Sequence, residues 1–300
     1  MKMSSVKLNE VQVDEVCSLA KEERLSLGFA GKTTIANDIH TILDKLNIIL
    51  LELPIESKTD KIAFSAAIMH MEENSDKLTF IGVNTSDYYD NQVYSIAHEL
   101  YHFYTKSGSH ISRLKDEIID INEVKANLFA AEFLLPKSIL KSIILNQFKK
   151  SNLEKIQNKK LLRFIVRLHC TWWLPYSIIL KRLNEIGAIT KGQYNELNKV
   201  NVRDPKEEYY KLGQAFNREV FQKLNQVTNT IGTSPEEIEI IIRNFEDSLI
   251  DESEFANILA LFNKRPDEFG FEAEISQDDL DQFEDFFSKD GDDESRPHTS

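Results

Sequence analysis

The spacing of apolar residues predicts a mixed first half and a helical remainder. Apolar side chains recur at helical spacing over residues 13–47, with a break near 28–33. Three later runs are rich in Ile, Leu, Val and Phe and predict strands over 48–54, 62–70 and 78–84. Turn-forming residues between the last two runs favour a small antiparallel sheet.

Helical spacing then continues to about residue 270. It predicts one helix over 91–105 and another over 118–135, which Pro136 stops. The apolar stretch 161–180 is interrupted by charged residues, so it predicts a buried helix pair rather than a membrane span, which needs about 20 mostly apolar residues. Further helices are predicted over 206–227, 234–249 and 252–262. We therefore expect an α+β fold, in which a small antiparallel sheet packs on a helix pair and a mostly helical C-terminal half follows.

Charge and cysteine content narrow the range of functions. The 300-residue chain has a formal net charge of −13, which favours solubility and opposes binding to nucleic acid. Cys17 and Cys170 lie far apart, so we expect neither a disulfide framework nor a zinc site built from cysteines. The first residues do not resemble a secretory signal. These features predict a cytoplasmic protein.

The sequence His-Glu-Leu-Tyr-His at 98–102 is the motif that carries chemistry. On a helix, positions i and i+4 lie one turn apart on the same face, so His98 and His102 can bind one metal ion. Zinc readily accepts two imidazole nitrogens at this spacing. Glu99 lies next to the first ligand and is placed to act as the catalytic base toward a metal-bound water.

A catalytic zinc site usually has a third protein ligand and an open position. We expect this ligand on the helix predicted over 118–135, where Glu123 precedes the first apolar residue of the buried face by three positions. Asp120 and Glu132 are the alternatives. Glu132 is offset by about 180° from Glu123 around the helix and is expected to face solvent. The apolar face itself consists of Ala126, Phe129, Ala130 and Phe133.

Several sequence blocks resemble the ImmA/IrrE family of zinc metallopeptidases. The first runs from the strand end at 81–84 through Asp90 to Ser-Ile-Ala-His-Glu-Leu-Tyr-His at 95–102. The second begins at Glu123 with Glu-x-x-Ala-Asn-x-Phe-Ala-Ala and ends in Leu-Leu-Pro at 134–136. A weaker third block lies at 176–183, and the resemblance covers about residues 15–195. It implies that Glu123 is the third zinc ligand. It also implies a zincin-like helix pair, in which the two histidines lie on one helix and the glutamate ligand lies further along the chain on the next.

The resemblance also implies an activity and a partner. Family members act on transcriptional repressors of mobile elements or of stress responses, so the expected function is a zinc-dependent endopeptidase that uses one Zn²⁺ ion. Its expected substrate is a helix-turn-helix repressor encoded nearby. No oxyanion-stabilising residue is assigned, because Tyr101 is expected to point to a different helix face and His110 is expected in a solvated loop.

We expect the chain to be organised in four parts. Residues 1–145 would form the zincin-like metallopeptidase domain, and 146–200 a helical segment that resembles a helix-turn-helix. A C-terminal helical region over 201–270 would precede an acidic, disordered tail over 271–300. The basic residues between 149 and 167 motivate an alternative function: a zinc-containing transcriptional or protein-binding regulator without proteolytic activity.

Overall fold

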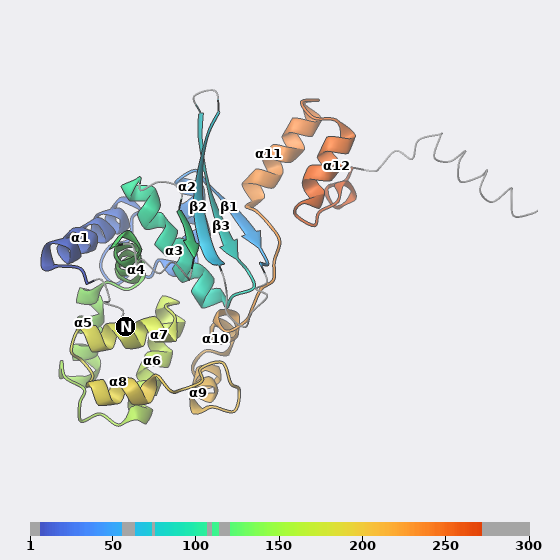
Figure 1. The fold of residues 1–300 in the computed structure, drawn as a ribbon. Helices are drawn as coiled ribbons and strands as arrows, with labels where there is room; N and C mark the ends of the chain where they lie inside the picture. The colour runs from blue at the N-terminus through green and yellow to red at the C-terminus, as the bar shows by residue number, and fades with distance from the viewer. Residues whose placement is uncertain (1–6, 56–63, 74–75, 107–109, 114–120, 272–300) are drawn as a thin grey trace, which may run out of the picture. The chain divides into compact units, whose positions relative to one another are not determined.

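Four strands form one sheet within the residues that the computed structural model describes, which are 7–55, 64–73, 76–106, 110–113 and 121–271. Along the sheet the order is β1-β3-β2-β4 (Figure 1). The strands are β1 (Ile48–Leu53), β2 (Phe64–Glu73), β3 (Asp76–Asn84) and β4 (His110–Arg113). The three predicted strands are confirmed. The fourth was not predicted, since a run this short shows too little alternation to be recognised.

The sheet is mixed rather than wholly antiparallel. β2 is antiparallel to both β3 and β4, whereas β1 runs parallel to β3. The reason is the position of the β2–β3 hairpin, which places β3 beside β1, so that two strands of the same direction become neighbours. The predicted α+β class is therefore confirmed, and the expectation of a purely antiparallel sheet is wrong for β1.

Two helices and the sheet enclose the centre of the fold. Helix α3 (Tyr89–Thr105) packs against β2 and β3, and α4 (Ile121–Leu134) packs against α3 (Figure 1). Val93, Ala97 and Leu100 recur at helical spacing on α3 and are fully buried, as is the predicted apolar face of α4. Both predicted helices are confirmed. The second begins at Ile121 among the described residues, and residues 118–120 lie outside them.

Shorter elements before the sheet complete this part of the core. Helix α1 packs against α4, and α2 packs against β1. The predicted break between them lies around Gly28 and Gly31, both of which have positive φ angles, 93° and 57°. The elements are α1 (Glu10–Ser26), η1 (Ala36–Asp38) and α2 (Ile39–Lys45).

After α4 the described residues form helices joined by irregular segments, and no further strand. The apolar stretch 161–180 forms parts of α6 and α7, which confirms the predicted buried pair, and the turn between them contains Pro175. No helix among the described residues combines the length and the apolar character needed to cross a membrane. The elements are α5 (Lys137–Phe148), α6 (Asn158–Trp172), α7 (Tyr176–Glu185) and α8 (Lys191–Leu197).

The single helix predicted over 206–227 is two helices, α9 (Glu208–Phe216) and α10 (Arg218–Leu224). Asn217 separates them in an extended conformation, and its side chain accepts a hydrogen bond from the backbone N–H of Val220. The turn brings Phe221 so close to Gly213 that a Cβ on this glycine would lie 2.2 Å from the ring. Tertiary packing here outweighs the continuous helical pattern.

A second compact unit, Ile238–Ser300, has its own small core. Helix α11 (Pro235–Glu246) enters it, and α12 (Glu252–Ala260) and η2 (Pro266–Phe269) follow, so the two predicted helices are confirmed. Phe245 stacks on Phe255 with ring centroids 4.3 Å apart. The predicted tail after Phe271 lies outside the described residues. The four-part division expected from the sequence stays a prediction.

Glu132 does not face solvent as its helical position suggested. Its carboxylate is buried and lies 2.8 Å from the guanidinium of Arg182 on α7. The other carboxylate oxygen accepts a hydrogen bond from the backbone N–H of Lys137, at the start of α5. The expectation was wrong because α7, fifty positions further along the chain, covers this side of α4.

Replacing Arg182 with Ala is expected to lower the free energy of unfolding by about 3–5 kcal/mol, because Glu132 would keep a buried charge without its cation. Chemical denaturation monitored by circular dichroism measures this change. Lys199→Ala is the control, since its pair with Glu196 is exposed, and it should cost less than about 0.5 kcal/mol. Equal losses in the two variants would contradict the interpretation.

Candidate metal centre

Three side chains from α3 and α4 converge on one point. His98 and His102 project from successive turns of α3, with ring centroids 5.3 Å apart. Glu123 lies in the first turn of α4, and its carboxylate reaches toward both rings. One possible ligand atom from each of the three residues lies within 4.8 Å of the others. The structure thus brings together all three predicted ligands.

The contacts of Glu123 define the geometry of this group. One carboxylate oxygen, Oε2, lies 3.1 Å from Nε2 of His98, and the other, Oε1, lies 3.3 Å from Nε2 of His102. The side chain of His102 is fully buried, and that of His98 is 10 % exposed. Glu123 retains 30 % exposure, so the group is open to solvent on the side of α4.

Glu99 is buried beside the first histidine. Its side chain belongs to the same helical turn as His98, and only 1 % of the residue is exposed. The negative charge of Glu99 is close enough to favour the protonated form of His98. The structure therefore places the predicted base next to the group of three ligands.

The pKa values reflect how strongly these groups interact. Hydrogen bonds from His102 and His98 lower the pKa of Glu123 far below its ordinary value. Burial alone would lower the pKa of His98, but its hydrogen bond to Glu123 and the charges of Glu99 and Glu123 raise it instead. A cation is thus favoured at this point, whether it is a proton on the imidazole or a metal ion.

Two further residues support the ligands, and the sequence analysis missed both. Asn127 lies one turn after Glu123, donates a hydrogen bond to the Glu123 carbonyl and also contacts the side chain of His98. The hydroxyl of Tyr94, one turn before His98, donates to the carbonyl of Asn127 at 2.9 Å. Such outer contacts orient metal ligands. Asn127 lies four residues after Glu123, and Tyr94 lies four residues before His98. This spacing puts each on the same helix face as a predicted ligand, and the sequence alone could have indicated it.

Other residues considered from the sequence lie elsewhere. Glu132 is paired with Arg182, and Asp120 lies outside the described residues. Tyr101 is buried, with its ring 5.8 Å from that of Phe129. His110 was expected in a loop, but it begins strand β4.

The donor set suits a divalent metal ion. Two imidazole nitrogens and one carboxylate, with one side open, match a catalytic zinc site, which needs a free coordination position. Residues 45–184 match the sequence model of a peptidase family, Peptidase_M78, described as the IrrE N-terminal-like domain. The chain carries a domain of the ImmA/IrrE family. This IrrE-like domain implies a metallopeptidase-family role and a bound metal, and the group of His98, His102 and Glu123 could hold that ion.

The IrrE-like match contains both helices that carry the predicted site, and it ends within α7. The chain after residue 184 lies beyond it. No curated protein matches the chain at a significant level.

Glu123→Gln is expected to weaken Zn²⁺ binding by about 10–100-fold or more, because a neutral amide replaces the anionic donor that contacts both histidines. Competition with a chromophoric chelator measures the dissociation constant. Glu196→Gln, which removes an exposed carboxylate, is the control and should leave the affinity unchanged. Equal affinities in the wild type and Glu123→Gln would show that Glu123 is not a ligand.

Zinc affinity is also expected to fall as the pH drops below neutral. The metal needs a neutral imidazole, and the raised pKa of His98 makes protons compete from a higher pH than at an ordinary histidine. Each displaced proton costs about tenfold in affinity per pH unit below that pKa. Chelator titrations between about pH 8 and about pH 6 measure this dependence. A flat profile over that range would contradict the proximity of His98 to the metal.

Proposed function

We propose that this protein is a zinc-dependent endopeptidase. The observation that carries the proposal is the convergence of His98, His102 and Glu123 from two helices, with Glu99 buried beside the first histidine. Two nitrogen donors and one oxygen donor with an open side favour zinc over magnesium or calcium, which prefer oxygen ligands only. Manganese or iron are the other metals that this donor set accepts.

The chemistry follows from the positions of these residues. A zinc ion bound here would lower the pKa of a coordinated water and polarise the scissile carbonyl. Glu99 accepts the proton of the attacking water and returns it to the leaving amine. His98 and His102 would each offer one imidazole nitrogen to the ion, and Glu123 contacts both rings. Glu99 is only 1 % exposed, so its carboxylate is shielded from bulk solvent.

The proposed substrate is a protein, and specifically a helix-turn-helix repressor of a mobile element or a stress response. The ImmA/IrrE resemblance supports this choice. A helix-turn-helix repressor encoded next to this gene would be the first substrate to test. An unrelated helix-turn-helix repressor of similar size is the matched control, because general proteolysis would degrade both proteins.

The alternative is a zinc-containing regulator without proteolytic activity. The basic residues between 149 and 167 motivated it, and most of these side chains are exposed. Lys159 forms an ion pair with Glu208, and Arg167 lies over the ring of Phe164. These contacts account for two of the cations within the fold itself. A purely structural metal site would also have no need for Glu99.

Glu99→Gln is expected to slow substrate cleavage by about 10²–10⁴-fold while zinc binding is retained, because the amide cannot accept a proton and is not a ligand. Gel electrophoresis and mass spectrometry of the incubated repressor measure cleavage, and metal analysis of the same sample measures zinc. Glu196→Gln again serves as the control. If the biological activity survives Glu99→Gln undiminished, the regulator is the better description of this protein.

A further inference from the structure

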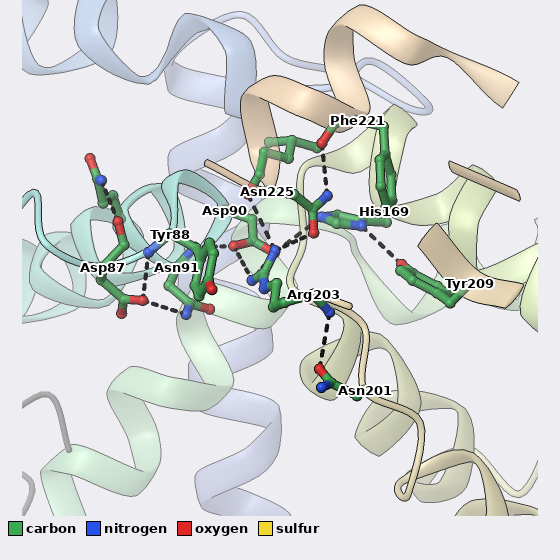
Figure 2. Close-up of polar contacts among 12 residues, drawn as sticks. Asp87, Tyr88, Asp90, Asn91, His169, Asn201, Arg203, Tyr209, Phe221 and Asn225 are labelled. Atoms are coloured by element: carbon green, nitrogen blue, oxygen red, sulfur yellow. Dashed lines mark hydrogen bonds and ion pairs between the residues drawn. The ribbon is translucent and has the colours of Figure 1, made fainter. Parts of the chain in front are cut away.

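A buried polar cluster joins the first turn of α3 to the chain beyond residue 200. Asp90 at the start of α3 is fully buried, and its carboxylate contacts two cationic or hydrogen-bonding groups (Figure 2). Nη2 of Arg203 lies 2.6 Å and 2.9 Å from its two oxygens. Nε2 of His169, on α6, lies 3.1 Å from Oδ2. Asp90 is therefore the meeting point of three distant segments.

Tyr209 and His169 extend the cluster beyond Asp90. Burial raises the pKa of Tyr209 well above its usual value, so its hydroxyl is a donor, and it lies 2.9 Å from Nδ1 of His169. His169 lies between the two groups, with Nδ1 facing the Tyr209 hydroxyl and Nε2 3.1 Å from Oδ2 of Asp90. Burial alone would raise the pKa of Asp90, but the hydrogen bond from His169 and the charges of His169 and Arg203 lower it. Asp90 is ionised, and Arg203 supplies a full positive charge beside it.

Arg203 is itself held in place from two sides. Its Nη1 lies 2.5 Å from the side-chain oxygen of Asn225, which follows α10. The guanidinium also lies over the ring of Tyr88, 4.0 Å from its centroid, at the N-cap of α3 (Figure 2). Such a planar, doubly anchored group cannot be replaced by lysine without loss.

A second set of contacts comes from residues 226–232, an irregular segment after α10. The carbonyl of Gln226 accepts from the backbone N–H of Tyr89, the first residue of α3, at 3.0 Å. Thr228 accepts from the side chain of Gln92 at 3.0 Å. Further along, Gly232 exchanges two backbone hydrogen bonds with Glu52, at 2.9 Å and 3.1 Å, on the edge strand β1. The segment thus connects the start of α3 to the sheet.

We propose that Arg203, acting through Asp90, positions the metal-bearing helix α3 together with segment 226–232, so that metal binding depends on residues outside the matched domain. His98 follows Asp90 by eight positions on the same helix, which is about 12 Å at 1.5 Å per residue. A helix is stiff over this distance, so a shift of its first turn also moves the ligands. Arg203 is a positioning residue and touches neither the ligands nor Glu99.

The test is Arg203→Gln, which removes the cation and leaves Asp90 ionised and buried. Two readouts are used, and only the first rests on the proposed metal site. The dissociation constant for Zn²⁺ is expected to rise about tenfold. Hydrogen exchange of the backbone amides at 89–94 in the metal-free protein is expected to accelerate by about tenfold, because the first turns of α3 open more often.

A double variant separates positioning through Asp90 from a general loss of stability. In Asp90→Asn/Arg203→Gln both readouts should change no more than in Arg203→Gln alone, because the two residues act through one contact and their effects are not additive. Arg203→Lys keeps the positive charge but not the planar guanidinium with its paired N–H donors, so it should give intermediate values. Gln193→Ala is the control: Gln193 donates to the carbonyls of Leu153 and Ile156, away from α3, so it should destabilise the protein without changing either readout.

The outcomes are distinguishable. If Arg203→Gln changes stability as Gln193→Ala does, with zinc affinity and exchange at 89–94 unaltered, the proposal is overturned. Changes in the double variant that equal the sum of those in Asp90→Asn and Arg203→Gln would equally show that Arg203 does not act through Asp90. If the wild type binds no zinc, the proposed function fails while the exchange experiment still tests the positioning. Should Arg203→Gln not fold, Asn225→Ala removes the anchor of the guanidinium and is expected to give the same changes in weaker form.

Discussion

The separation between α3 and α4 is the constraint on which the rest of this structure depends. Two imidazoles on one helix and a carboxylate on another can share a metal ion only if the helices pack closely and in one register. Alanines provide that closeness, because Ala97 on α3 and Ala126 and Ala130 on α4 are all fully buried. The sheet behind α3 and α1 behind α4 then limit how far either helix can move.

Two buried ion pairs fix the positions of the helices around this site. Glu132 pairs with Arg182 where α4, α5 and α7 meet, and Asp90 pairs with Arg203 where α3 begins. Each of these carboxylates would be costly without its partner, so each pair tolerates only one relative position of the elements that it joins. The candidate metal centre follows the same rule, since the two histidines that face Glu123 stabilise its ionised form. Charge compensation and ligand geometry are therefore set by the same packing.

The family domain and the compact structural unit have different limits. The match ends at residue 184, yet the unit that contains the candidate metal centre extends to Glu237. Residues 201–232 complete it through Arg203 and through backbone hydrogen bonds to α3 and β1. A chain truncated at residue 184 would lack Arg203 and would therefore leave Asp90 without its cation. The compact structural unit is thus larger than the segment that sequence similarity recognises.

Local patterns alone determined the helix with His98, Glu99 and His102, the fold class and the buried helix pair, because these depend on interactions between residues a few positions apart. Tertiary structure decided what depends on distant segments. It placed Glu123 against the histidines and covered Glu132 with Arg182, although helical spacing put Glu132 on the solvent side. It set β1 parallel to β3, and it divided the helix expected over 206–227 where Phe221 closes on Gly213. No periodicity reports such contacts, since each partner lies on an element whose position only the packing of the whole unit fixes.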